Sequence, residues 1–352
     1  MNKKGVIEVQ FNWIYVAVVG AVFLLVFATI AGNIRKSAKR SLERDATTYF
    51  DEIFTSLQGS ENTEHSISLP DLSIEVDADK NFCYFYRIGD SDLQGRKTNY
   101  VPIFSPKLIK KEILSYSLGW DIPFRAGYFL YMTTPLAAYV LVGSDFSLNK
   151  LSDDLPNHLT KFTVSSSSNF ENENYDLVRF ISYTSDPISY SFHGSIERMD
   201  DEKVTALLIN ENEKSVTYYE KNDDSFVEAG KTYYMDLPTL FATIYSENKN
   251  SYECNLISDT KAVERLQRIS DVLVERVDII RNSNLLPKCR DSAIFSKYDE
   301  ASVQLKQLKD TVTGMLSHEI IKMEDMQTLA SIKNNLNSIN GIVNRRSCPT
   351  VY

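Results

Sequence analysis

The sequence predicts an α+β or α/β protein with an N-terminal transmembrane helix, a mixed β-rich body and a C-terminal helical hairpin. Three observations lead to this fold class. Residues 9–34 carry no charge, residues 70–259 contain runs of β-branched and aromatic residues, and residues 260–352 repeat apolar residues at spacings of three and four. The chain has 352 residues, of which 43% are hydrophobic and 24% are charged, so it can form more than one packed core.

A membrane span is expected at residues 11–32, after a short tail of residues 1–10. An apolar helix of this length crosses a hydrocarbon layer of roughly 30 Å, and Trp13 and Tyr15 suit the membrane interface. A cleaved secretory signal is the alternative, but its apolar region covers only about 7–15 residues. A second uncharged stretch, residues 126–144, is centred on Pro135, which favours two strands joined by a turn over a second span.

Residues 33–58 are expected to continue the span as a juxtamembrane amphipathic helix. Its first part is basic, with Arg35, Lys36, Lys39, Arg40 and Arg44. Its second part carries one apolar stripe, formed by Tyr49, Phe50, Ile53, Phe54 and Leu57. The basic residues suit lipid headgroups, and a solvated helical neck is the alternative. Polar residues at 61–70 then predict a linker.

The body at residues 70–259 is predicted to mix strands and helices, with a subdivision near 165–175. The expected strands are 72–76, 82–88, 128–133, 137–142, 161–165, 177–182, 204–210 and 215–220, and the expected helices are 146–155 and 238–245. Strand 137–142, helix 146–155 and strand 161–165 form a β-α-β pattern, which makes parallel pairing plausible. The polar turn between 204–210 and 215–220 predicts a hairpin.

The C-terminal region at residues 260–352 is expected to form three helices, the last two folding back near 317–323. Cys289 and Cys348 lie at nearly equal distances from that turn, so a disulfide between them is expected at the open end of the hairpin. Cys83 and Cys254 then remain for each other, because a helix of about 20 residues would hold Cys254 and Cys289 roughly 30 Å apart. Four reduced, buried thiols are the alternative.

The four cysteines also bear on which side of the membrane the body lies. Disulfides persist outside the cytoplasm, so the expected topology is single-pass in the cell membrane with an extracytoplasmic C-terminal body. The positive-inside rule points the other way, because more basic residues follow the span than precede it. The cysteine argument is preferred, since long domains translocate largely regardless of flanking charge.

Motif spacing excludes several kinds of site. The closest pair of glycines, Gly89 and Gly95, is too widely spaced for GxGxxG, GxxxxGK[ST] or GxSxG, and HExxH and CxxC are absent. A net charge of −9 argues against nucleic acid as a partner. No cofactor, metal or catalytic residue is therefore expected. Ser317, His318 and Glu319 are adjacent on a predicted helix and do not face one another, and His193 has no partner visible in the sequence.

Ser144 and Asp145 are the best candidates for a ligand site. They directly follow the buried strand 137–142, and in α/β proteins ligands bind beyond the carboxyl ends of the strands. The competing interpretation makes Asp145 a capping residue for the next helix.

Two resemblances add to this reading. The N-terminal layout, with Lys3-Lys4-Gly5 followed by Glu8 and a long apolar helix, resembles type IV pilin-like subunits with class III signals. That resemblance covers about the first 57 residues and leaves open whether the leader is cleaved after Gly5. The segments QFNWIYVAVVGA, YYMDLPTLFATIYSENKNSYECN and RRSCPTVY are similar to uncharacterised single-pass membrane proteins of small-genome archaea, which implies no known activity.

The expected function is therefore a membrane-anchored, extracytoplasmic surface or assembly module, pilin-like in its N-terminal layout. Its expected partners are the lipid bilayer and other proteins or further copies of itself. The alternative is a membrane-tethered α/β hydrolase or ligand-sensing domain with its site near Asp145.

Overall fold

The computed structural model describes residues 13, 15–38, 41, 62–79, 82–88, 102–183, 193–257, 262–283, 287–318 and 320–352. The side chains of residues 70–72, 77–79, 82–88 and 262 are outside this description. The chain divides into two compact units, Met1–Asp51 and Glu52–Tyr352. Each is described by itself.

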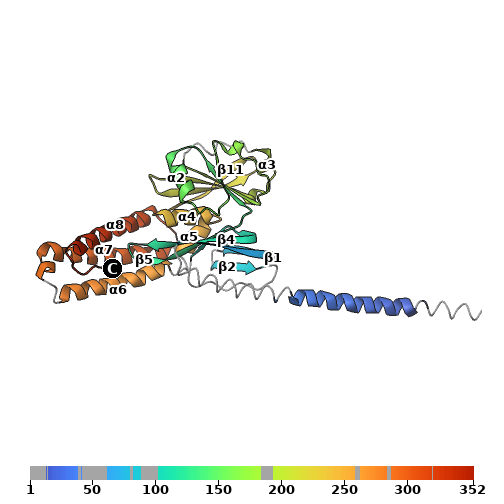
Figure 1. Ribbon diagram of the computed structural model, residues 1–352, viewed down its shortest axis with the longest axis horizontal. Helices are drawn as coiled ribbons and strands as arrows, with labels where there is room; N and C mark the ends of the chain where they lie inside the picture. Colours follow the sequence, from blue (N-terminus) through green and yellow to red (C-terminus); the bar gives the residue numbers. More distant parts are fainter. Residues whose placement is uncertain are drawn as a thin grey trace, which may run out of the picture. The chain divides into compact units, whose positions relative to one another are not determined.

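The first unit contains a helix at Tyr15–Ala38, the only described helix that is long and apolar enough to span a membrane (Figure 1). Its 24 residues extend over about 36 Å at 1.5 Å per residue. The helix continues six residues past the predicted end of the span at Gly32, as expected if it runs on into the juxtamembrane segment. The predicted apolar stripe of residues 49–57 lies outside the described residues.

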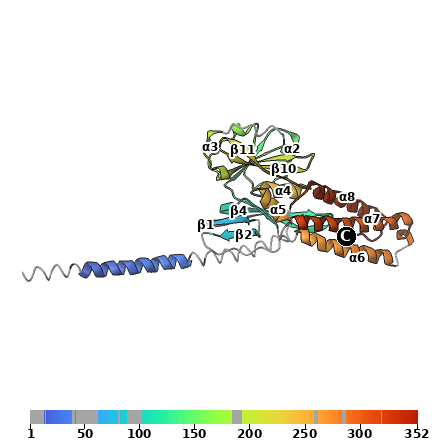
Figure 2. The ribbon, with the colours of Figure 1, turned by 180° about the vertical axis from the view of Figure 1, so that it is seen from behind.

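The second unit is mixed α+β, as the sequence predicts, and contains two sheets (Figures 1 and 2). The first sheet has the order β2-β1-β4-β5-β3 and is antiparallel except for the pair β3–β5. Its strands are β1 (Thr63–Asp79), β2 (Phe82–Ile88), β3 (Ile103–Phe104), β4 (Leu108–Asp121) and β5 (Arg125–Thr133).

Strand β1 corrects one expectation. Residues 61–70 are predicted to be a linker because they are mostly polar, yet residues from Thr63 onward are paired along β4. The side chains of Glu64, His65, Ser66 and Ser68 are exposed, while Leu69 is buried. The partner strand β4 lies more than 40 residues further along the chain, so no local pattern indicates this pairing.

The second sheet has the order β11-β10-β9-β8-β6-β7. Strands β6 to β9 run parallel, and β9, β10 and β11 form an antiparallel meander. The bounds are β6 (Ala137–Val142), β7 (Lys161–Val164), β8 (Leu177–Ser182), β9 (Val204–Asn210), β10 (Ser215–Asn222) and β11 (Ser225–Tyr233). The predicted β-α-β unit and the predicted β9–β10 hairpin are both present.

Both faces of the second sheet are covered. One face contributes Tyr139 and Leu141 to the main core, where α2 (Phe146–Asp154) adds Leu148 and Leu151. The other face packs against the loop around Phe170 and against the short helix α3 (Gly194–Glu197). Every residue of β6 is buried, as expected for a central parallel strand.

Helices α4 (Leu237–Tyr245) and α5 (Lys249–Ile257) lie between the two sheets in both views (Figures 1 and 2). Aromatic rings fill this region. The ring centroid of Tyr131 lies 5.1 Å from that of Tyr245 and 6.0 Å from that of Phe241, and Tyr139 lies 5.9 Å from Tyr245. These rings join the two sheets into one hydrophobic core.

The chain ends in three helices, α6 (Ala262–Asn282), α7 (Ser292–His318) and α8 (Met323–Arg345). The turn between α7 and α8 falls at the predicted place. The predicted apolar stripes are the buried ones, including Leu266 and Val277 on α6, Leu305 and Val312 on α7, and Leu336 and Val343 on α8. Periodicity therefore identifies the packed face of each helix.

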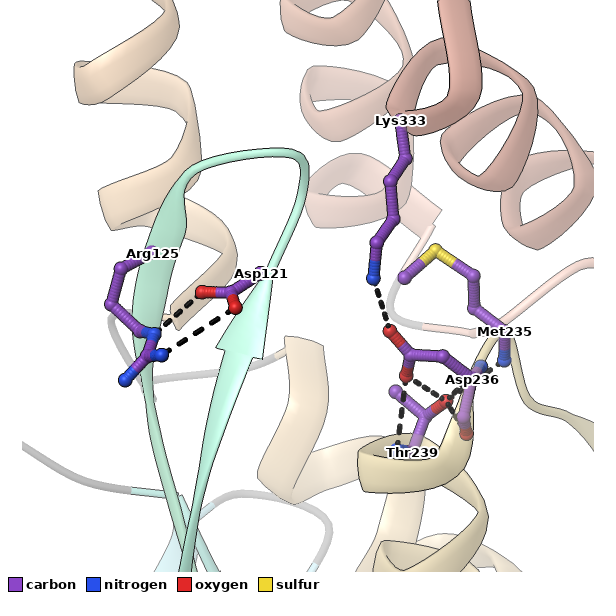
Figure 3. A network of polar contacts seen from close by, with 6 residues as sticks. All are labelled: Asp121, Arg125, Met235, Asp236, Thr239 and Lys333. Carbon is purple, nitrogen blue, oxygen red and sulfur yellow. Dashed lines mark hydrogen bonds and ion pairs between the residues drawn. The ribbon is translucent and has the colours of Figure 1, made fainter. Parts of the chain in front are cut away.

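Lys333 ties this helical region to α4 (Figure 3). Its Nζ lies 3.0 Å from Oδ2 of Asp236, the N-cap residue of α4, whose Oδ1 accepts a hydrogen bond from the backbone N–H of Thr239. Thr239 Oγ1 accepts hydrogen bonds from the backbone N–H groups of Met235 and Asp236, which completes a capping box. Figure 3 also shows Arg125 paired with Asp121 at the β4–β5 turn.

Candidate functional site at the switch point of the parallel strands

The chain connections of the second sheet run in opposite directions on the two sides of β6, so its carboxyl end is a topological switch point. The connection through α2 leads to β7 on one side of β6, while β8 pairs on the other side. Such a switch point leaves a crevice beyond the strand ends, which is where open α/β sheets bind ligands. The sequence candidates Ser144 and Asp145 lie at this point.

Gly143 allows the chain to leave β6 at this position. Its φ of +127° is strained for any residue with a side chain, and its N–H still donates to the Val164 carbonyl at 2.9 Å. The next residue, Ser144, is exposed, and Asp145 then occupies the N-cap position of α2. The glycine thus turns two polar residues outward from a fully buried strand.

Asp145 does not make the hydrogen bond that the capping interpretation requires. Its side chain accepts no hydrogen bond from the first turn of α2, although its backbone carbonyl accepts one from Asn149 N at 3.2 Å. Its Oδ1 is shielded from solvent and has no hydrogen-bond partner within the described part of the chain. An acceptor held in this way lacks its usual compensation for lost hydration.

The surroundings of Asp145 are acidic. Burial raises the pKa of the Tyr183 phenol, which follows β8, and the nearby Tyr234, Glu211, Asp145 and Asp154 raise it further. Burial also raises the pKa of Tyr234 to about 12, with a contribution from Glu211. Both phenols therefore keep their protons at neutral pH and are available as hydrogen-bond donors.

Polar contacts link the first turn of α2 to the β9–β10 turn. Ser147 Oγ donates a hydrogen bond to Glu211 Oε2 at 2.8 Å, which holds the β9–β10 turn against α2. The titratable side chains near Tyr183 and Asp145 are carboxylates and phenols, and the ammonium group of Lys214 lies 5.4 Å from the ring centroid of Tyr234. Across the described residues, no group of three or more His, Cys, Asp or Glu side chains could hold a metal ion.

The predicted cysteine sites lie elsewhere in the fold. Cys289 and Cys348 form a disulfide with a Cα–Cα distance of 5.7 Å, at the open end of the α7–α8 hairpin. Cys254 on α5 is also disulfide-bonded. The side chain of Cys83 on β2 is outside the description, so the pairing of Cys83 with Cys254 stays a prediction.

One polar pair was missed in the sequence. His193 N-caps α3, and its Nδ1 lies 2.9 Å from Ser195 Oγ, which also accepts a hydrogen bond from Asn172 N at 2.8 Å. The spacing of two residues is the only signal that could have indicated it. The pair fixes the loop around Asn172 against α3, because Asn172 Nδ2 in turn donates to the Tyr175 carbonyl at 3.0 Å.

The fold and the candidate site thus define a two-sheet α+β protein with a parallel-strand switch point and a C-terminal disulfide-closed helical hairpin. No protein-family model, curated protein or solved structure matches the chain significantly.

Proposed function

We propose that the protein is a membrane-anchored surface or assembly module whose body lies outside the cytoplasm and binds other proteins. The observation that carries the proposal is the helix Tyr15–Ala38, of whose most apolar stretch nothing is buried in the structure. Leu24, Leu25 and Phe27 are each more than 60% exposed. Apolar surface of this extent is unfavourable in water, at about 25 cal/mol per Å², and a bilayer removes it.

The disulfide supports the orientation. Cys289 is fully buried and Cys348 is 6% exposed, so the bond is enclosed by the helical region that it closes. Such bonds form and persist in oxidising compartments and are rare in reducing ones. The basic residues after the span favour the opposite orientation, but they do not prevent translocation of a long domain.

The pilin-like N-terminus supports an assembly role within this proposal. In such an arrangement the apolar helix would pack against bilayer lipid or other copies, and the body would present its surface to protein partners. The net charge of −9 makes nucleic acid an unfavourable partner.

Protease accessibility tests the orientation. Protease added to intact cells is expected to degrade the body, residues 62–352, while a cytoplasmic marker protein stays intact. Alkylation before and after reduction is expected to label Cys289 and Cys348 only after reduction. A body that resists protease until the cells are lysed would contradict the proposed orientation.

A second candidate function is a membrane-tethered hydrolase or ligand sensor that uses Asp145. It is favoured by the shielded, unpartnered Oδ1 of Asp145 at a switch point. Asp145→Asn keeps the shape of the side chain and removes its charge, so it separates the two functions. If a purified sample shows turnover or ligand binding that this variant abolishes while its unfolding transition is preserved, the second function replaces the first.

A further inference from the structure

The carboxyl ends of four strands of the second sheet lie at the edge that contains the switch point. Strands β6, β8 and β9 run parallel, and β11 runs in the same direction because β9 and β11 are both antiparallel to β10. The residues that follow these four ends include Asp145, Tyr183, Glu211 and Tyr234. The carboxyl edge of the sheet thus gathers carboxylates and phenols from segments far apart in the sequence.

Direct contacts hold these segments together. Ser147 Oγ in the first turn of α2 donates a hydrogen bond to Glu211 Oε2 at 2.8 Å, and Asp145 is the N-cap residue of the same helix. Tyr234 N donates to the Lys214 carbonyl at 2.9 Å, which fixes the end of β11 against the β9–β10 turn. The start of α2, the β9–β10 turn and the end of β11 therefore belong to one surface.

The carboxylates at this edge are not neutralised by described side chains. Among these side chains, Asp145, Glu211 and Asp154 form no ion pair. Burial raises the pKa of the Tyr183 phenol and the three carboxylates raise it further, as expected if their charges act together near its hydroxyl. The ammonium group of Lys214 lies over the ring of Tyr234, 5.4 Å from the centroid.

Tyr234 supplies an unused hydroxyl at this edge. The residue is only 3% exposed, yet its hydroxyl has no hydrogen-bond partner within the part of the chain that the structure describes. Burial raises the pKa of this phenol to about 12, and the charge of Glu211 contributes, as expected for a nearby carboxylate. A buried phenol usually has a hydrogen-bond partner, so this hydroxyl is available to a ligand.

Two features decide the chemical class of the ligand. Within the described ranges, no three carboxylates are grouped closely enough to hold a metal ion, which favours a larger cation. An ammonium group has three N–H donors and no acceptor, and phenol and carboxylate oxygens are acceptors. Phe146, next to Asp145, is 82% exposed and offers an apolar surface to an alkyl chain.

We propose that the carboxyl edge of the second sheet binds an alkylammonium group. Lysine side chains of partner proteins and free primary amines share this chemistry. The ammonium group would lie between the hydroxyls of Tyr183 and Tyr234 and beside the Glu211 carboxylate. Asp145 would add its charge, and the alkyl chain would cover Phe146. The inference goes beyond the proposed function and depends on neither the anchor nor the orientation, so the protease result leaves it standing.

A ligand-observed NMR titration of the full-length protein in detergent micelles tests the site, with Nα-acetyl-lysine methylamide as the probe. Saturable binding at millimolar concentration is expected. Nα-acetyl-norleucine methylamide has the same side chain without the ammonium group. It is expected to bind about tenfold more weakly or worse, since a hydrogen bond to a charged group contributes about that factor or more.

Butylamine, which is the lysine side chain alone, separates the two sources of the ligand. Weaker binding of butylamine than of the capped lysine supports the site and identifies a protein ligand. Equal or tighter binding of butylamine supports the site and identifies a free amine.

Three variants assign the binding to this edge. Glu211→Gln and Asp145→Asn are each expected to weaken binding of the capped lysine about fivefold, the effect of one charge at close range even in water. Tyr234→Phe is expected to weaken it by about the same factor and to keep stability, because its hydroxyl has no partner to lose. Asp153→Asn, exposed on α2, and Tyr219→Phe, on the opposite face of the sheet, are the matched controls, with changes of less than about twofold expected.

Three results would each overturn the proposal. The first is no saturable binding of the capped lysine at millimolar concentration. The second is equal affinity for the capped lysine and the capped norleucine. The third is that the three edge variants bind like the Asp153 and Tyr219 controls while all five keep the unfolding transition of the unmodified protein.

Discussion

Arg179 on β8 is expected to be the most sensitive polar position in the body. It is only 8% exposed, and its guanidinium group donates to Thr205 Oγ1 at 2.9 Å and to three backbone carbonyls in the last turn of α4 and just beyond it. These carbonyls belong to Ile244 at 2.7 Å, Glu247 at 2.7 Å and Ser246. Arg179 thus satisfies the end of α4, where carbonyls lack helical partners and the helix dipole favours a cation.

The size of the effect follows from what Arg179→Met leaves behind. Methionine keeps much of the aliphatic packing but donates no hydrogen bond, so the three carbonyls lose their partner. Each buried polar group without a partner costs about 1–3 kcal/mol. Some of the carbonyls will recover water near Glu247, so the expected loss is roughly 4 kcal/mol of unfolding free energy.

Urea unfolding followed by the fluorescence of the fully buried Trp120 measures this loss. A Trp13→Phe background removes the other tryptophan of the chain. Arg198→Met, at an exposed position after α3, is the matched control and is expected to change the unfolding free energy by less than about 0.5 kcal/mol. Equal effects of Arg179→Met and Arg198→Met would refute the reasoning.

Three further predictions concern the disulfide, the α4–α8 contact and pH. Cys289→Ser with Cys348→Ser is expected to lower the unfolding free energy by about 4 kcal/mol, since the bond closes a loop with a sequence separation of 59. Urea unfolding of the double variant and of the unmodified protein, both without reductant, measures this loss, and equal midpoints would contradict it. Asp236→Ala is expected to lower the unfolding free energy by about 1–2 kcal/mol, because α4 loses its N-cap. Lys333→Met is expected to lower it by about 1 kcal/mol or less. A double-mutant cycle that finds no coupling between the two substitutions would show that the 3.0 Å contact contributes nothing to stability. Burial raises the pKa of Tyr131, Tyr139, Tyr218, Tyr245 and Tyr252 above its ordinary value near 10. Above about pH 10 the unfolded chain therefore binds fewer protons than the folded one, and stability falls by about 1.4 kcal/mol per pH unit for each such tyrosine. Tyrosinate absorbance should then appear together with unfolding, and its appearance in the folded protein would contradict the prediction.

The elements that sequence reasoning predicted well are those whose burial repeats along the chain. The apolar stripes of α6, α7 and α8 follow the helical period, and β6 is an uninterrupted apolar run. In both cases the pattern of apolar residues along the chain indicates which side chains are buried. Pro135 correctly separates β5 from β6, because proline is tolerated in a turn between strands. Cys289 and Cys348 lie at nearly equal distances from the turn between α7 and α8, which was sufficient to predict the bond between them.

The sequence alone thus determined the apolar N-terminal helix, the buried face of each C-terminal helix and the candidate position of Asp145. Only the tertiary structure decided that polar residues after Thr63 belong to a strand, that Arg179 completes α4, and that Lys110 and Glu202 line one cleft. The physical reason is the range of the interactions. Local periodicity records which side of an element is buried. The pairing of residues 63–69 with β4, the capping of α4 by Arg179 and the shared cleft of Lys110 and Glu202 depend on partners more than 40 residues away, whose approach leaves no local pattern.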